Sequence, residues 1–247
     1  KSQVADFLIE GGASINGFYV INSAAGNFKI ENASTENFRI ESSKIGRFDI
    51  LTSTTGDLLI LKNSVTRGFW IEHSTIGIYS LDNSTASVLS LRKNSHSLKV
   101  NVWHSTLQRI QIRSGSFVGH LRCQFNLHDP VHLVLEESGF GYLDLENTVF
   151  PEFTTLSLSD CKANCLSLNN FCNYGTVFFS RLKPLNKWGD FQKDANKQVA
   201  LKDGVYTFEE INDPKKFPST LRLTDSDLGK MQFINCDLRQ FQRFEFS

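Results

Sequence analysis

Apolar residues return along this chain in pairs, with one residue between the two members and about ten residues between pairs. The strict part of the pattern is Phe28/Ile30, Phe38/Ile40, Phe48/Ile50 and Leu58/Ile60. One-residue shifts separate the pairs that follow, which are Phe69/Ile71, Tyr79/Leu81, Leu89/Leu91 and Leu98/Val100. Repetition over so long a stretch is typical of a repeat protein, in which each unit is one small structural element.

A weaker set of positions lies midway between the pairs. It comprises Thr35, Ile45, Thr55, Val65 and Ile76, which are preceded two residues earlier by Ala33, Ser43, Ser53, Asn63 and Ser74. The repeating unit is therefore about five residues long, and units with large and small inward residues alternate.

The spacing within a pair predicts a very short extended segment, because alternate residues of a strand share one face. So short a strand buries too little surface alone and must stack on copies of itself about 4.8 Å away. A helix is excluded, since spacings of two and eight never produce the apolar stripe of an amphipathic helix. The pattern thus predicts an all-β protein built as a parallel β-solenoid.

The units at Ser43 to Ile50 and at Ser53 to Ile60 resemble the pentapeptide-repeat family. Units of that family carry a large apolar residue at the centre and a small residue two positions earlier, a place that Phe fills here in every second unit. The resemblance implies a right-handed parallel β-helix with about 20 residues per coil. It also implies that Phe28 and Phe48 stack on one wall, and Phe38 and Leu58 on another.

Three regions are expected along the chain. Solenoid coils occupy residues 1–180, a charged insertion occupies 181–219, and coils resume over 220–247. The insertion lacks the apolar pairs, and one short helix is predicted around Asp190 to Leu201. Neither end reads as the polar cap that repeat proteins need, so we expect a larger parent protein, or end coils that meet a partner or a second copy.

Composition narrows the classes of partner and cofactor. The 247 residues include 26 Lys and Arg against 26 Asp and Glu, so no basic bias points to nucleic acid. No segment approaches the roughly 18 consecutive apolar residues of a membrane span. The five cysteines are odd in number and sparse, which favours a reducing compartment such as the cytoplasm, and their spacing fits no common zinc site. We expect them in the solenoid interior, with no metal and no cofactor.

The middle residue of each pair should face outward, where any binding must occur. Leu59 and Trp70, with Trp103 further on, are the apolar residues among these, and they are the predicted contacts for a partner. An equally good interpretation is that the insertion folds back over them.

No catalytic residue is predicted, because acidic residues are dispersed and no nucleophile or phosphate-binding motif occurs. We therefore expect a non-catalytic rigid scaffold or protein-interaction module. The alternatives are a carbohydrate-binding or carbohydrate-active β-helix, which a groove lined by two or more carboxylates would favour, and a solenoid that assembles end to end.

Overall fold

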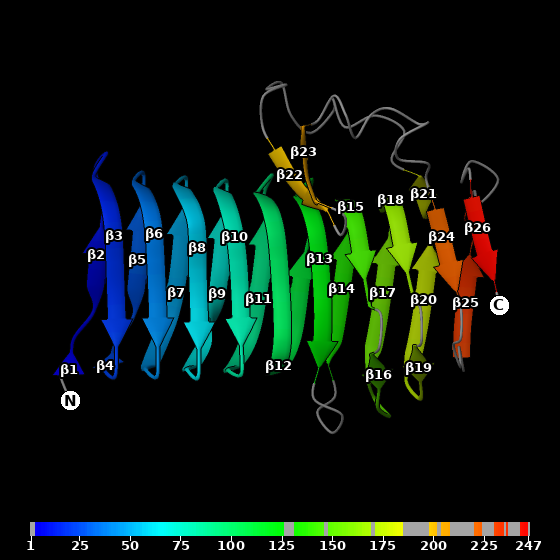
Figure 1. Ribbon diagram of the computed structural model, residues 1–247, viewed down its shortest axis with the longest axis horizontal. Coiled ribbons are helices and arrows are strands. Elements are labelled where there is room, and N and C mark those ends of the chain that lie inside the picture. The colour runs from blue at the N-terminus through cyan, green and yellow to red at the C-terminus, as the bar shows by residue number, and fades with distance from the viewer. Residues whose placement is uncertain are drawn as a thin grey trace.

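A computed structural model describes residues 3–125, 131–145, 148–168, 171–184, 198–201, 204–207, 220–223, 230–234, 236 and 243–246. Every regular element in these ranges is a β-strand, and none is a helix, so none of the described residues forms a helix able to cross a membrane. Strands of successive coils lie side by side along one long axis, with the two termini at opposite ends (Figure 1). The predicted parallel β-solenoid is confirmed.

The coils contribute strands to two parallel stacks, here called wall A and wall B. Wall A contains β1 (Gln3–Val4), β2 (Phe7–Ile9), β4 (Ala24–Ala25), β5 (Phe28–Glu31), β7 (Lys44–Leu51), β9 (Val65–Glu72), β11 (Thr85–Arg92), the second half of β12 (His96–Ile112), β14 (His132–Glu136), β17 (Thr155–Ser159), β20 (Thr176–Ser180) and β25 (Lys230–Ile234).

Wall B contains β3 (Ser14–Ile21), β6 (Ser34–Glu41), β8 (Thr54–Lys62), β10 (Thr75–Asp82), the first half of β12, β13 (Phe117–Phe125), β15 (Gly139–Asp144), β18 (Lys162–Ser167), β21 (Lys183–Pro184), β24 (Thr220–Leu223) and β26 (Arg243–Phe246). Two short pairs lie outside the walls: the parallel β16 (Val149–Phe150) with β19 (Cys172–Asn173), and the antiparallel β22 (Gln198–Leu201) with β23 (Gly204–Thr207).

Register gives the coil length directly. Phe28 pairs with Phe48 and Phe48 with Phe69, so the first of these coils has the predicted length and the second is one residue longer. Ile110 pairs with Leu133 and Leu133 with Leu156, so the coils further along are longer again. Leu156 pairs with Val177, so the next coil is shorter again, and coil length varies around the predicted value without a steady trend.

Inward positions alternate in steps of two and three residues. In β7 and the corner before it, Ser43, Ile45, Phe48 and Ile50 are all buried. A uniform strand would place every second residue inward, so the step of three shows that each long strand bends in its middle. The predicted five-residue units, alternately small and large, are confirmed.

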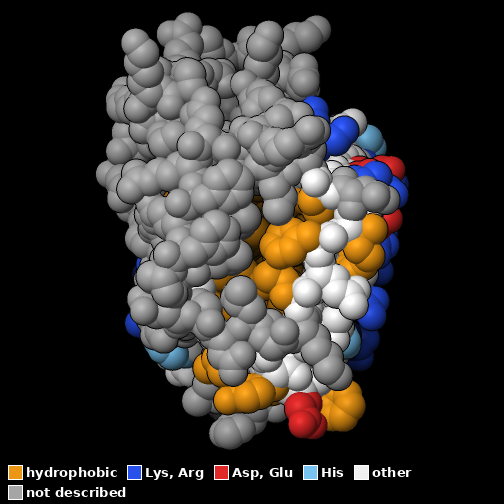
Figure 2. All heavy atoms as spheres, turned by 90° about the vertical axis from the view of Figure 1, so that its right-hand side faces the viewer, with side chains coloured by type: hydrophobic (Ala, Val, Ile, Leu, Met, Phe, Trp, Pro, Cys, Tyr) orange, Lys and Arg blue, Asp and Glu red, His pale blue; other side chains and the backbone are white. Residues whose placement is uncertain are grey.

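Stacked aromatic rings form the core of the N-terminal coils. On wall A the ring centroids of Phe28 and Phe48 are 5.6 Å apart, and those of Phe48 and Phe69 are 5.4 Å apart. Phe38 on wall B meets Phe48 edge to face, with centroids 4.9 Å apart and an angle of 83°. Both geometries are favourable for aromatic rings. Viewed from the C-terminal end, hydrophobic side chains of described residues occupy the middle of the coil (Figure 2).

One predicted register is wrong by a single residue. Phe38 pairs with Leu59 rather than with Leu58, and the buried residue two positions later is Leu61. Wall B carries an irregularity here, because Thr35 pairs with Thr55 but Asn37 already pairs with Leu58. The extra residue also displaces the next small unit. Ser64 and Thr66 are buried in place of the predicted Asn63 and Val65, and Val65 is 48% exposed.

Many corners of the central coils combine a left-handed residue with a buried serine. His73, for example, has φ 49° and precedes Ser74, whose hydroxyl donates to the carbonyl of Glu72 at 2.7 Å. The same hydroxyl oxygen accepts the backbone N–H of Ser53, one coil earlier, at 3.1 Å. The hydroxyl thus satisfies a backbone donor that the sharp corner removes from the ladder. This explains the polar turns without reference to a ligand.

The insertion interrupts one strand position of wall B. Lys183 in β21 pairs with Lys162 of β18, which is the separation of an ordinary coil. Thr220 in β24 pairs with Cys165, which also belongs to β18. The chain between Cys165 and Thr220 is more than twice as long as an ordinary coil. All of the added length therefore lies within a single coil. Wall B continues to Pro184, beyond the boundary at residue 180 expected from the sequence.

The helix predicted around Asp190 to Leu201 is corrected in its last part. Gln198–Leu201 is extended and pairs with β23, while residues 190–197 lie outside the described residues. Ala200 and Val199 pair with Val205 and Tyr206, and β-branched and aromatic residues of this kind favour strands.

Tyr79 provides a test of this core. Its ring lies edge to face on Phe69, and among the described residues its hydroxyl has no hydrogen-bond partner. Burial raises its pKa far above the ordinary value. We expect Tyr79→Phe to stabilise the fold by about 1 kcal/mol, because it removes a buried polar group. Urea unfolding of the two proteins measures the difference. Tyr19→Phe is the control, since Tyr19 is 61% exposed. A less stable Tyr79→Phe protein would contradict this packing.

Candidate functional site

Wall A carries a shallow groove across the N-terminal coils, here called the groove. It consists of two hollows of about 660 Å³ and about 530 Å³, which share Asn27 and Arg67. The first hollow is floored by small residues such as Gly26 and Gly46, and the second contains Trp70. The groove spans several coils, so a ligand lying in it would contact more than one repeat.

The first hollow lies at the bend of the wall A strands, where several of its lining residues are small. At the bend the coils approach closely, since a Cβ on Gly46 would lie only 2.8 Å from the carbonyl oxygen of Gly26. Side chains complete the backbone hydrogen bonds there: the Asn27 N–H donates to Asp6 Oδ1 at 2.7 Å, and the Arg47 N–H to Asn27 Oδ1 at 2.9 Å. The glycines are thus required by coil stacking, whatever the groove binds.

Trp70 is half-buried and held from two sides. The Arg47 guanidinium carbon lies 4.1 Å from the centroid of the Trp70 ring, a cation–π contact, and Arg47 Nε donates to Asp49 Oδ1 at 2.7 Å. A Cβ on Gly68 would lie 3.1 Å from the Trp70 ring and 2.6 Å from the Val88 carbonyl oxygen, at φ 151°. A side chain at position 68 would therefore displace the ring.

Positively charged side chains outnumber negatively charged ones along the groove. Lys29, Lys44, Arg47 and Arg67 line it, against the carboxylates of Asp6 and Asp49. Lys29 pairs with Glu31 and Arg47 with Asp49. Lys44 and Arg67 are exposed, and neither forms an ion pair with another described residue. The groove is therefore a surface of net positive charge with an aromatic ring.

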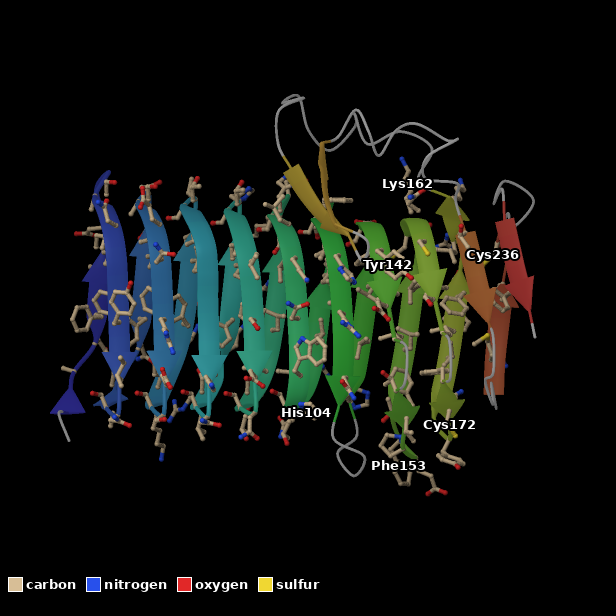
Figure 3. All side chains as sticks on the ribbon, viewed as in Figure 1. His104, Tyr142, Phe153, Lys162, Cys172 and Cys236 are labelled. Carbon is tan, nitrogen blue, oxygen red and sulfur yellow. The ribbon has the colours of Figure 1, made fainter. Side chains whose placement is uncertain are left out.

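A second polar group, here called the wall B cluster, lies on the outward face of β13 and β15. Asp144 is 1% exposed, and its Oδ2 lies 3.3 Å from Arg122 Nε and 3.7 Å from His120 Nε2. The Tyr142 ring meets His120 edge to face at 5.2 Å, and Figure 3 labels Tyr142 on β15. Arg122 also stacks on Trp103, 4.4 Å from its ring centroid. Partnered charges of this kind can stabilise a structure or carry out chemistry.

The hairpin β22–β23 of the insertion lies beside β12 and β13 (Figure 1). His120 is on β13 and points away from the core, because its inward neighbours are Val118 and Leu121, yet it is only 2% exposed. The insertion thus folds back toward wall B at β12 and β13. Trp70, which one interpretation of the sequence placed beneath the insertion, lies on wall A.

The predicted contact residues do not form one site. Trp70 lies on wall A, within the groove, and Trp103 lies on wall B, beside Arg122. The backbone of Leu59 pairs with Phe38 and Tyr79 on wall B, and its side chain lies outside the described residues. A role for any of the three in partner binding stays a prediction.

One corner of the solenoid exposes aromatic side chains, and it was not predicted. Phe153 is 81% exposed and Tyr174 is 63% exposed. They occupy the same corner in consecutive coils, since the Tyr174 N–H donates to the Phe150 carbonyl at 2.8 Å. Figure 3 shows Phe153 at the edge of the solenoid, near Cys172. We call Phe153 and Tyr174 the aromatic corner.

Several of these residues could not be found from the apolar pairs. His120 and Asp144 are outward residues of adjacent coils, and their proximity follows only once the register is known. Phe153 had a visible signal, because it falls outside the apolar pairs in the stretch from Val149 to Phe153. A Phe that the repeat does not place inward is a candidate for the surface.

The interior position predicted for the cysteines is confirmed for Cys123 and Cys161, each 1% exposed, and for Cys165, which is also buried. It is wrong for Cys172 and Cys236, which are only half-buried. Cys161 stands at a corner where other coils have serine, and its thiol lies 3.3 Å from the Ser159 carbonyl oxygen. Within the described ranges, no three His, Cys, Asp or Glu side chains gather as a metal site would need.

Comparison with known proteins finds no matching protein family, no similar curated protein and no similar solved structure.

The buried thiols allow a reactivity test. Burial raises the pKa of Cys161 to about 12, and burial together with the charge of Asp144 raises that of Cys123. At pH 8 only about one Cys161 in ten thousand is a thiolate, which is the reactive form. We expect iodoacetamide, followed by mass spectrometry, to leave both residues unmodified in the native protein. Both should react in urea. Native alkylation of Cys161 at the rate seen in urea would contradict the buried corner position.

Proposed function

We propose that this protein is a non-catalytic rigid scaffold that presents contact surfaces to a protein partner. The observation that carries the proposal is the backbone of Phe153, which has φ 67° although its side chain is 81% exposed. The left-handed region is unfavourable for a bulky side chain, by roughly 1–2 kcal/mol. An exposed ring recovers little of that cost through burial.

Other corners of the solenoid carry residues that adopt the left-handed conformation at a lower energetic cost than Phe. Their left-handed residues include Asn22, Asn32, Asn63 and Asn83, and asparagine tolerates this conformation well. Phe153 is the one large apolar residue among the described non-glycine residues with positive φ. Retaining Phe in a strained, solvent-facing position favours a role in binding, since neither strain nor exposure stabilises the solenoid.

The stacked coils supply the rigidity that a scaffold requires. Strands of consecutive coils pair continuously along wall A from β2 to β20, so an outward side chain is fixed relative to residues many coils away. The alternation of inward steps also supports kinship with pentapeptide-repeat proteins, which we include in the proposal.

The non-catalytic part of the proposal concerns the wall B cluster. His120 Nε2 is 3.7 Å from Asp144 Oδ2, beyond hydrogen-bond distance, so the pair lacks the contact expected of an oriented general acid–base dyad. Turnover of a polysaccharide or ester substrate that is lost in His120→Ala, with the fold retained, would contradict this part.

Carbohydrate binding is the second candidate function, and the groove favours it. Two carboxylates, Asp6 and Asp49, line the second hollow together with Trp70. Both are engaged, Asp6 by the Asn27 N–H and Asp49 by Arg47, which suits fixed recognition of hydroxyl groups better than proton transfer during cleavage. Assembly through end coils stays a prediction.

The scaffold proposal is tested with Phe153→Asn. We expect this change to raise the free energy of unfolding by about 1 kcal/mol, because Asn relieves the left-handed strain. The variant should also fail to retain a partner protein that the native chain captures from the source cell extract, compared by quantitative mass spectrometry. Tyr19→Asn, at another exposed aromatic, is the control and should keep the partner. A destabilised Phe153→Asn, or identical captured proteins, would contradict the proposal.

A further inference from the structure

We infer that the groove on wall A binds an acidic polysaccharide, with the sugar chain lying along the solenoid axis. This inference rests on the second candidate function, carbohydrate binding, and specifies the class of sugar. It depends on the charge, spacing and hydrogen-bonding state of the residues that line the groove.

Charge identifies the ligand as an anion. Lys44 and Arg67 belong to adjacent coils of wall A and both line the first hollow, which has no carboxylate among its lining residues. Neither forms an ion pair with another described residue, although Lys29 and Arg47 nearby are paired. Two unpaired cations on one concave surface repel each other, and a ligand that carries carboxylates removes this repulsion. Arg67 also lines the second hollow, so an anionic ligand bound to Arg67 can extend into both hollows.

Spacing favours a polysaccharide over a peptide. Groups at equivalent positions of adjacent coils recur about every 4.8 Å, and a pyranose unit advances a polysaccharide chain by close to this distance. Acidic side chains on one face of an extended peptide recur at roughly 6.8 Å, twice the rise per residue. Successive rings of a uronate chain can therefore lie over successive coils, whereas the acidic side chains on one face of a peptide strand recur at a longer spacing.

The backbone of the groove gives a second reason against a peptide strand. Peptides commonly bind to sheets by adding a strand to a free edge. Here β7 is paired with β5 on one side and with β9 on the other, so its backbone groups are already used. The remaining donors are side chains, mainly the ammonium of Lys44 and the guanidinium of Arg67, which suit the carboxylates and hydroxyls of a sugar.

The second hollow also offers an aromatic surface on which a sugar ring can lie. Trp70 is half-buried, and its ring is held by Arg47 on the adjacent coil. A fixed aromatic ring next to polar groups such as Asn27 and Asp49 matches the mixed character of a sugar, whose rings carry both C–H faces and hydroxyls. Lys44 and Arg67 then bind carboxylates in the first hollow, and Trp70 contacts a sugar ring in the second hollow, which Arg67 also lines.

The inference is tested by calorimetric titration of the full chain with three probes: a galacturonate oligomer, the neutral galactose oligomer of the same length, and poly-glutamate. We expect the galacturonate oligomer to bind at low salt, more weakly as salt rises, and at least about tenfold more tightly than the neutral oligomer or poly-glutamate. Lys44→Gln and Arg67→Gln should each weaken this binding by about three- to fivefold, as loss of an exposed ion pair does. Lys62→Gln is the matched control, because Lys62 is exposed on wall B outside the groove, and should leave binding unchanged.

Each other outcome overturns the inference in a distinct way. Equal affinity for neutral and acidic oligomers would retain carbohydrate binding but reject the acidic ligand. Tighter binding of poly-glutamate would assign the groove to an acidic peptide. Absence of galacturonate binding, or equal weakening by Lys62→Gln, would reject the groove as an anion site. None of these results concerns the aromatic corner. The scaffold proposal is therefore tested separately, by Phe153→Asn.

Discussion

The backbone pairing between consecutive coils is the constraint on which the rest of this structure depends. Each coil is hydrogen-bonded to the coil before it and the coil after it at a spacing of about 4.8 Å, so the interior of every coil must have nearly the same shape. Phe28, Phe48 and Phe69 therefore repeat as a stack of rings, and Ser53, Ser74 and Ser95 repeat as a chain of hydrogen bonds at one corner. A residue out of step breaks contacts in two neighbouring coils at once.

This constraint explains how much could be predicted from the sequence. Inward residues must repeat, so the parallel solenoid follows from periodicity. The coil length and the common wall of Phe28 and Phe48 were implied by the resemblance to pentapeptide-repeat proteins, and the register agrees with them there. The register near Leu58 could not be predicted, because an irregularity adds one residue without interrupting the run of apolar side chains. The return of the coils at residue 220 is visible in the sequence, because Leu221 and Leu223 of β24 form an apolar pair, whereas β21 is too short to show one.

Outward residues obey no such rule, and the functional surfaces were for that reason the least predictable. His120 and Asp144 are neighbours from consecutive coils, and only the register brings their side chains close together. Trp70 was recognised as an outward aromatic, but Arg47, Asp49 and Gly68 around it could not be grouped with it in advance. The repetition that determines the core thus leaves the walls free to vary, which is why a scaffold of this kind can carry an anion-binding groove on one wall and an exposed aromatic corner elsewhere.

A distance between two outward positions many coils apart tests the stacked register most directly. Lys29 and Ser157 lie in one outward row of wall A, which runs through Asp49, Trp70, Ser90, Gln111 and Val134. Six coil spacings separate them, which corresponds to about 29 Å. Spin labels on cysteines introduced at these two positions, measured by pulsed electron paramagnetic resonance after the native cysteines are replaced, should give one narrow distribution near that distance. A broad distribution, or a maximum displaced by more than the length of the labels, would contradict the continuous parallel ladder.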